Sequence, residues 1–398
     1  MVSEDDSKLR DSNQPIDYER LHIPVDWVPV QYYDAYNILF RIENTLRLLL
    51  FVVLKSHYRD EWENIQIADE VNPGTIRALA KIRREAAQDF GHLGSPSNNP
   101  LLFLNGGEIV RLITSEKYWQ YFQECFPANR KNTQLKLFEI LSIRNDMAHF
   151  RAINREHLVT LKNNINQVLK KAGDYLAGVV CYGLIGQPTS ITQEWSADLE
   201  RMSQGNVHLT IFPGSEGWLT IKLYYRQPIT TITELSNSDK LVMFKRLESL
   251  SILEHYKGIT NNIVSMQETV EAEMDEDDHL YFDDYIDAEL MFTAHVRTIN
   301  KHAEEFVSEV KRLVANILSE ESGKNATGEK TVLSVGTILW SDGLNSLWND
   351  IAKKAIESRF PEYWGDYFGK KAYVPENFIM RTRYFPWFAK TITQRDNP

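Results

Sequence analysis

The spacing of apolar residues changes once along this chain of 398 residues, and the change limits the folds open to it. From residue 33 to about 181, apolar side chains recur at steps of three and four, which is the spacing of one α-helical face. From Asn206 to Phe212, and again from Trp218 to Tyr225, they alternate with polar residues, which is the spacing of a β-strand. We therefore predict helices in the first half and a sheet in the second.

The pattern predicts an α+β protein that is mainly α, organised in three parts. Residues 1–30 form a mobile arm, residues 31–183 a helical bundle, and residues 205–398 an α+β domain with a hairpin at 206–225. A chain of this length is long for one hydrophobic core, which favours two domains. Helices are predicted at 33–57, 75–90, 107–126, 132–153, 156–181, 238–253 and 285–318, and a strand at 331–340.

Composition excludes several classes of protein. The formal charge of -11 argues against a protein that coats nucleic acid along its whole surface. Its two cysteines, Cys125 and Cys181, have no metal-ligand spacing, which excludes a disulfide scaffold and fits a reducing compartment. The longest apolar run, Leu48–Leu54, is far shorter than the roughly 20 residues of a membrane span. We expect a cytoplasmic protein that binds no membrane, metal or cofactor.

The residues Arg144-Asn145-Asp146-Met147-Ala148-His149 (the Arg–His motif) carry the main chemical signal. Residues 127–171 hold nine Lys and Arg against three Asp and Glu, which suggests an anionic ligand. His149 can transfer protons near neutral pH, and Arg144 can hold a phosphate and stabilise its charge. Arg144, Asn145 and His149 are thus candidate catalytic residues for RNA cleavage without a metal. The alternative is a surface or helix-capping histidine, since this spacing is common by chance.

The helical spacing of the Arg–His motif predicts where its side chains point. At about 100° per residue, Arg144 lies about 140° round the helix from His149, in the row of Leu141 and Ala148. The two side chains can meet at one phosphate only if Arg144 curls round, the helix is distorted or a second helix completes the site. We therefore expect the site at an interface. One face of the helix is predicted to hold Phe138, Ser142, Asn145, His149 and Ala152.

The Arg–His motif resembles the Arg-Asn-x-x-x-His signature of the HEPN superfamily, which includes ribonuclease toxins and RNA-cleaving parts of bacterial defence systems. Ile42-Glu43-Asn44-Thr45-Leu46-Arg47 resembles the first long helix of HEPN domains, where an acidic residue and an Arg lie near the active site. Tyr118–Phe122 and Asn129-Arg130-Lys131 resemble the segment that precedes the motif in the defence branches. The resemblance covers roughly residues 30–180.

The resemblance implies a homodimer in which each motif faces its two-fold mate. It implies attack of an RNA 2′-OH on the adjacent phosphate, leaving a 2′,3′-cyclic phosphate, in anti-phage defence by abortive infection. A phage or host trigger would act on the C-terminal domain. Two alternatives stay open: a non-catalytic RNA-binding or scaffold protein of this fold, and a regulatory protein that binds a protein partner. The residues predicted to contact substrate are Arg47, Glu43, Arg130, Lys131 and Arg151.

Residues 267–289 form a second unusual segment, with eleven acidic residues and no Lys or Arg. Clustered carboxylates can bind Mg²⁺ or Ca²⁺, but this run lacks the residue order and central Gly of an EF-hand loop. We predict a solvated charged loop. A specific alternative is that 271–287 occupies the basic groove near Arg144 and inhibits the protein.

Overall fold

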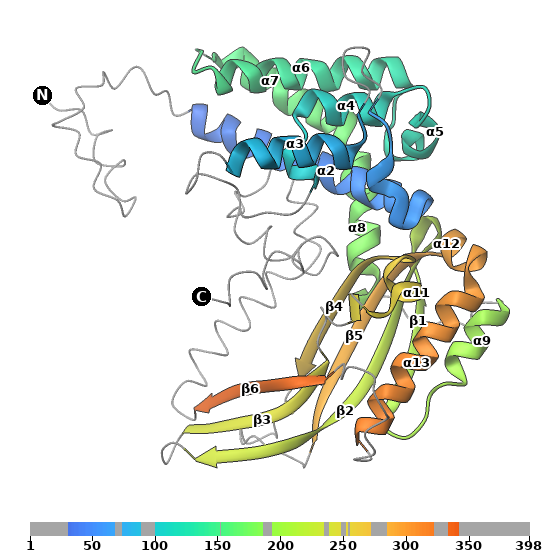
Figure 1. Ribbon diagram of the computed structural model, residues 1–398. Coiled ribbons are helices and arrows are strands. Elements are labelled where there is room, and N and C mark those ends of the chain that lie inside the picture. The colour runs from blue at the N-terminus through green and yellow to red at the C-terminus, as the bar shows by residue number, and fades with distance from the viewer. Residues whose placement is uncertain are drawn as a thin grey trace, which may run out of the picture.

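The computed structural model is an α+β fold whose described residues are mainly helical, with a helical half and a sheet half (Figure 1). The residues it describes are 31–67, 74–88, 100–151, 153–185, 193–234, 239–247, 252–253, 255–271, 285–321 and 333–341. The predicted arm at 1–30 and residues 272–284 of the acidic segment lie outside them. None of the described helices is long and apolar enough to cross a membrane.

The helical half is built on α2 (Gln31–Tyr58), whose apolar stripe is buried beneath the other helices (Figure 1). The predicted helices at 33–57 and 75–90 are confirmed, and that at 156–181 is a continuous helical run with a π-helical turn inside it. The predicted helix at 107–126 is broken after Thr114 into shorter pieces. The remaining elements are η3 (Arg59–Asn64), α3 (Ile76–Gln88), η5 (Pro100–Phe103), α4 (Gly106–Thr114), α5 (Trp119–Phe122), η6 (Gln123–Cys125), α6 (Arg130–Ala148), α7 (Arg155–Asn164), η7 (Ile165–Leu169, the π turn) and α8 (Lys170–Ile185).

The sheet half is an antiparallel sheet in the order β4-β5-β2-β3-β6, with β1 also paired to β2. The predicted hairpin is confirmed, with Ile211 opposite Ile221. The long β2 pairs with β1 and β5 along its first part and with β3 near its end. The strands are β1 (Val207–Pro213), β2 (Trp218–Glu234), β3 (Asp239–Leu247), β4 (Ile263–Glu271), β5 (Tyr285–His295) and β6 (Leu333–Ser341).

Helices cover one face of this sheet (Figure 1). The alternate β2 residues Leu219, Ile221 and Leu223 point into a core that α13 completes. The predicted strand at 331–340 is confirmed as β6. The helices of this half are α9 (Glu194–Glu200), α11 (Lys257–Thr260), α12 (Val296–Lys301) and α13 (Ala303–Glu321).

The prediction of one helix over 285–318 is wrong in its first third, where the chain forms β5. Leu290 and Ala294 are four residues apart, and an even step of four fits both one helical face and one strand face. In the structure both lie on the strand face that points into the core. The helix then begins only after His295, which caps α12 by accepting a hydrogen bond from the backbone N–H of Arg297 (3.1 Å).

The predicted helix at 238–253 is also wrong, because residues 239–247 form β3. The run Leu241-Val242-Met243-Phe244 is apolar without a clear period, so its spacing does not separate a helix from a buried strand. β3 pairs on one side with β2 and on the other with β6. Two ladders of backbone hydrogen bonds therefore override the local helical tendency.

Two clusters of buried apolar side chains lie in the described chain. One is formed by the helices together with Trp218 and Val264 of the sheet, and the other lies between the sheet and α9, α11 and α13. The two halves therefore share apolar contacts as well as a covalent connection. The exact domain boundary between 183 and 205 stays a prediction.

The two halves meet where the end of α2 touches α12. The ring centroids of His57 and Tyr121 are 4.2 Å apart, and Nη1 of Arg297 lies 3.2 Å from Nε2 of His57. The hydroxyl of Thr298 donates to the carbonyl of Ser56 at 2.8 Å. Burial, helped by the charge of Arg297, lowers the pKa of His57 to about 4. His57 is therefore a neutral partner in this junction at physiological pH.

Candidate functional site

The Arg–His motif forms the last turn and the C-terminal cap of α6. The helix begins after Asn129, whose side chain accepts a hydrogen bond from the backbone N–H of Asn132 (3.0 Å). Leu137, Ile140 and Ile143 are buried and fix the rotation of the helix. Because α6 is anchored along this apolar line, the direction of every motif residue before residue 148 is set by the core.

The end of α6 is a Schellman motif with an unusual residue in it. The helix ends at Ala148, so the prediction that it continues to Ile153 is wrong. The backbone N–H of Phe150 donates to the carbonyl of Met147 (3.0 Å), and that of Arg151 donates to the carbonyl of Asp146 (2.8 Å). Phe150 has φ of 55°, a left-handed conformation in which glycine is usual at this position.

His149 is the C-terminal cap of α6, with φ of -98° and ψ of 13°. Its backbone N–H still donates to the carbonyl of Asn145, one turn back, at 3.0 Å. Its side chain is exposed, and no hydrogen bond or ion pair joins its ring to another of the described residues. Ala152 lies outside the described residues. His149 is thus an exposed cap whose imidazole is open to solvent.

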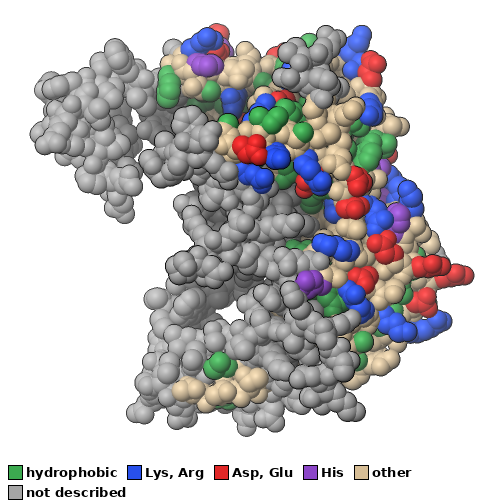
Figure 2. Space-filling model, viewed as in Figure 1, with side chains coloured by type: hydrophobic (Ala, Val, Ile, Leu, Met, Phe, Trp, Pro, Cys, Tyr) green, Lys and Arg blue, Asp and Glu red, His purple; other side chains and the backbone are tan. Residues whose placement is uncertain are grey.

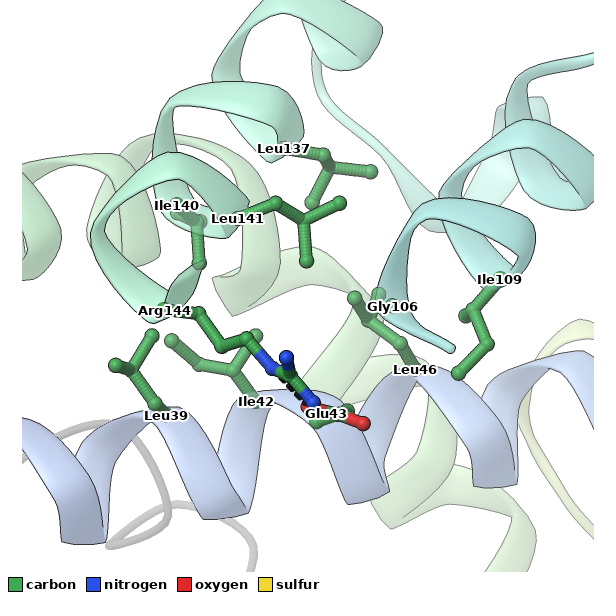
Figure 3. Close-up of a pocket in the computed structure, with 10 residues that line it drawn as sticks. All are labelled: Leu39, Ile42, Glu43, Leu46, Gly106, Ile109, Leu137, Ile140, Leu141 and Arg144. Carbon is green, nitrogen blue, oxygen red and sulfur yellow. Dashed lines mark hydrogen bonds and ion pairs between the residues drawn. The ribbon is translucent and has the colours of Figure 1, made fainter. Parts of the chain in front are cut away.

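Arg144 instead turns toward Glu43 on α2 (Figure 3). The Nε of Arg144 donates to Oε2 of Glu43 at 3.3 Å, and Nη2 of Arg47 donates to Oε1. The side chain of Glu43 is 17% exposed and that of Arg144 is 38% exposed. Two guanidinium groups around one carboxylate leave this cluster with a net positive charge, which favours an anion beside Arg144.

The cluster lies at the edge of a small pocket between α2, α4 and α6 (Figure 3). The space measures about 10 Å³, close to the least that holds one water molecule. Its wall is apolar apart from the Glu43–Arg144 pair. A nucleotide cannot enter it, so a substrate would meet Arg144 from the exposed side. The lining residues are Leu39, Ile42, Glu43, Leu46, Gly106, Ile109, Leu137, Ile140, Leu141 and Arg144.

The predicted substrate residues do not gather into one site. Arg47 is held in place by the carbonyls of Leu101 (2.9 Å) and Leu104 (3.2 Å), which is a structural role. Arg130 is at the opposite end of α6, roughly 28 Å from His149 at 1.5 Å per residue, and pairs with Glu116 at 2.7 Å. Lys131 is exposed beside it.

Arg151 lies close to the motif and contacts it. Its Nη1 donates to Oδ1 of Asp146 at 3.1 Å, across the Schellman turn. At this end of α6, toward the upper left of Figure 2, histidine, basic, acidic and apolar side chains lie together on the surface. The structure thus brings Arg144 together with Glu43 and Arg47, and Arg151 together with Asp146. No hydrogen bond or ring contact joins Arg144 to His149 within the described part of the chain.

Phe150 was not among the residues predicted for the site. In the structure its side chain is 93% exposed, more than any other large apolar side chain of the described residues. An exposed aromatic residue directly after a candidate catalytic histidine was visible in the sequence. The left-handed backbone was not, because it depends on where α6 ends.

Comparison with known proteins gave no match, either to a protein-family model, to a curated protein or to a solved structure. The described residues contain no group of three or more His, Cys, Asp or Glu side chains placed to hold a metal ion. The candidate site must therefore be argued from its own geometry.

Proposed function

We propose that this protein is a metal-independent endoribonuclease of HEPN type that acts as a homodimer. The observation that carries the proposal is the end of α6, which presents His149 to solvent one turn beyond the exposed Asn145. On the same helix, Arg144 reaches the surface from a cluster with a surplus of positive charge. These are the groups that phosphate cleavage by an RNA 2′-OH requires.

In the proposed reaction, His149 takes the proton from the RNA 2′-OH. The 2′ oxygen then forms a bond to the adjacent phosphorus, and the bond from phosphorus to the 5′ oxygen breaks. The leaving 5′ oxygen takes up a proton, and the other product ends in a 2′,3′-cyclic phosphate. Arg144 stabilises the negative charge on the phosphoryl oxygens during the attack. DNA resists cleavage because it has no 2′-OH.

The homodimer is proposed because positions 144 and 149 lie about 140° apart round an ideal helix and Arg144 is turned to Glu43. A second copy whose α6 crosses the first would bring one copy's Arg144 to the other copy's His149. The exposed apolar side chains on α6 support such a contact: Leu135 is 62% exposed and Phe138 is 38% exposed. Leu135, Phe138, Ser142 and Asn145 follow one another at steps of three and four, so they share one face.

An alternative function is RNA binding without cleavage. It is favoured by the same angle between positions 144 and 149, and by the ion pair that keeps Arg144 on Glu43. In either case we propose that the sheet half receives the trigger, because its junction with α2 connects it to the helix that carries Glu43. Anti-phage defence by abortive infection is the proposed setting, since a nuclease of this kind must stay silent until it is triggered.

Cleavage of RNA in EDTA by wild type and His149→Ala tests the proposal, with the product ends analysed. Cyclic-phosphate ends that appear with wild type and disappear with His149→Ala are expected. His208→Ala is the matched control, since His208 is exposed on β1, far from α6 in the sequence, and is expected to cleave like wild type. Cleavage of an all-deoxy substrate, or loss of wild-type activity in the chelator, would contradict the mechanism.

A further inference from the structure

The outer face of α7 and α8 carries a row of basic residues that begins beside the Arg–His motif. Arg155, Lys162, Lys170 and Lys171 (the basic track) are all exposed. No ion pair joins any of the four to another of the described residues. By contrast, Arg130, Lys136, Arg144 and Arg151 are each paired with a carboxylate. Of the nine basic residues at 127–171, four are thus paired; the four of the basic track are available to a ligand, as is Lys131 at the far end of α6, which has no ion pair to a described residue either.

The π turn of η7 keeps the basic track in line. Two turns of α-helix take about seven residues, which is the step from Arg155 to Lys162. A π turn holds one residue more than an α turn, so two turns that include it take about eight residues. That is the step from Lys162 to Lys170. Without the extra residue of η7, Lys170 would be rotated round the helix, out of line with Arg155 and Lys162.

The opposite side of the same helical run is the core side. Leu158, Leu161, Val168 and Leu169 are buried, so the basic track cannot turn inward. Between residues 155 and 171 the single acidic residue is Glu156. The exposed residues between the cations include Asn163, Asn166 and Gln167, which can donate hydrogen bonds to phosphate oxygens. Over its roughly 23 Å length this face is thus suited to a polyanion.

Phe150 lies in the connection between α6 and α7, directly after His149. Its side chain is 93% exposed and its backbone is left-handed, with φ of 55°. The Schellman cap requires the left-handed backbone at this position, and that conformation turns the Phe150 ring to solvent. Aromatic rings presented to solvent beside basic residues are the means by which proteins stack the bases of single strands.

We infer that the end of α6 and the outer face of α7–α8 bind single-stranded RNA, with a base stacked on Phe150 and phosphates held by Arg155, Lys162, Lys170 and Lys171. The inference rests on the proposed function for the chemistry at His149, but it concerns binding. Stacking fixes the nucleotide next to His149, and the basic track holds the strand that runs on from it. α6 and α7 lie side by side, which keeps the beginning of the basic track close to the end of α6 (Figure 1).

The test measures binding of a fluorescent oligouridylate of about ten nucleotides by anisotropy. All variants are made in a His149→Ala background, so that cleavage does not enter the measurement. The first variant replaces Arg155, Lys162, Lys170 and Lys171 with Gln. A control for total charge makes the same four changes at Arg201, Lys81, Lys301 and Lys311, which are exposed elsewhere; Arg201 and Lys81 there pair with Asp198 and Glu85. Circular dichroism checks that both fold.

The basic-track variant is expected to bind at least about tenfold more weakly, and its log Kd should depend less steeply on log salt, by about 3 in slope. The control should bind like the His149→Ala parent. Equal weakening in both variants, or an unchanged Kd in the first, overturns the inference. Competition by polyglutamate as strong as by RNA also overturns it, since that would indicate an acidic protein as the partner.

The second arm compares Phe150→Tyr with Phe150→Leu. Tyrosine keeps the stacking ring, so its Kd should match that of phenylalanine. Leucine keeps the apolar contact but has no ring, and binding should weaken roughly tenfold. Equal Kd values for the two overturn the stacking role of Phe150. Wild-type cleavage in EDTA is scored separately, so a protein that binds along the basic track without cutting contradicts only the proposed nuclease.

Discussion

Replacing Glu43 with glutamine tests whether the carboxylate between Arg144 and Arg47 both stabilises the helical half and restrains Arg144. The substitution keeps the shape of the side chain and removes its charge. Two unit charges about 4 Å apart attract by about 4 kcal/mol at an effective dielectric constant of about 20. The glutamine amide can still accept one hydrogen bond, and Arg47 keeps its carbonyl partners, so the expected net loss is about 2 kcal/mol.

The assay is denaturant unfolding followed by circular dichroism, with Glu116→Gln as the matched control. Glu116 also pairs with an arginine, Arg130, but its side chain is 85% exposed. An exposed pair contributes at most about 1 kcal/mol, so the control should unfold close to wild type. A loss of about 2 kcal/mol at Glu43 corresponds to a fall in Tm of roughly 4–8 °C for a unit of 150–250 residues.

The same variant should bind RNA several times more tightly, because Arg144 would be released toward solvent and one negative charge would be gone. Equal unfolding midpoints for Glu43→Gln and Glu116→Gln would refute the stabilising role. Weaker RNA binding by Glu43→Gln, with the fold intact, would refute the restraint on Arg144 and assign Glu43 to the substrate itself.

Three further outcomes are expected. His149→Ala should leave the free energy of unfolding within about 0.5 kcal/mol of wild type, because His149 is an exposed cap without a side-chain partner among the described residues. Calorimetry on the variant used in the cleavage assay measures this free energy. Phe150→Gly should raise the free energy of unfolding by about 1 kcal/mol, since glycine accepts a φ of 55° without strain, and denaturant titration measures it. The third concerns pH: burial is the main cause that lowers the pKa of both His57 and His295 to about 4, below the 6.5 of the unfolded chain. Their contribution to stability is thus complete above pH 6.5 and is lost as pH falls toward 4, because the unfolded chain binds the protons. A Tm series from pH 8 to about 4.5 should show the fall, and the double variant His57→Gln, His295→Gln should reduce it.

Elements with one clear period were predictable from the sequence. α2 buries a stripe at steps of three and four, and the β1–β2 hairpin alternates on both sides of a turn rich in Gly, so local pattern and tertiary packing agree. β3 and the first third of the predicted 285–318 helix were not predictable. Their residues fit two periods, and the choice was made by strands distant in sequence: β6 pairs with β3, and β2 with β5.

The candidate site follows the same division. That Arg144 and His149 diverge was predictable, because it depends only on helical geometry. Two other features depended on how neighbouring helices pack, and the sequence did not predict them. Arg47 is held by the carbonyls of Leu101 in η5 and of Leu104 just after it, and Arg130 lies at the far end of α6. Spacing along a sequence reports which residues share a helix face. It does not report which charged residues a neighbouring helix will already have neutralised.

This limit explains why the unpaired cations are the better guide to a ligand. A basic stretch in a sequence counts every Lys and Arg equally, although Arg130, Lys136 and Arg144 on α6 already have carboxylate partners in the fold. Among the described residues no carboxylate forms an ion pair with the cations of the basic track. A phosphate chain gains most where it need not compete with a carboxylate, so we expect RNA to follow α7 and α8, although the proposed cleavage would take place at the end of α6. The proposed cleavage and the proposed binding would then meet at Phe150, whose exposed ring directly follows His149.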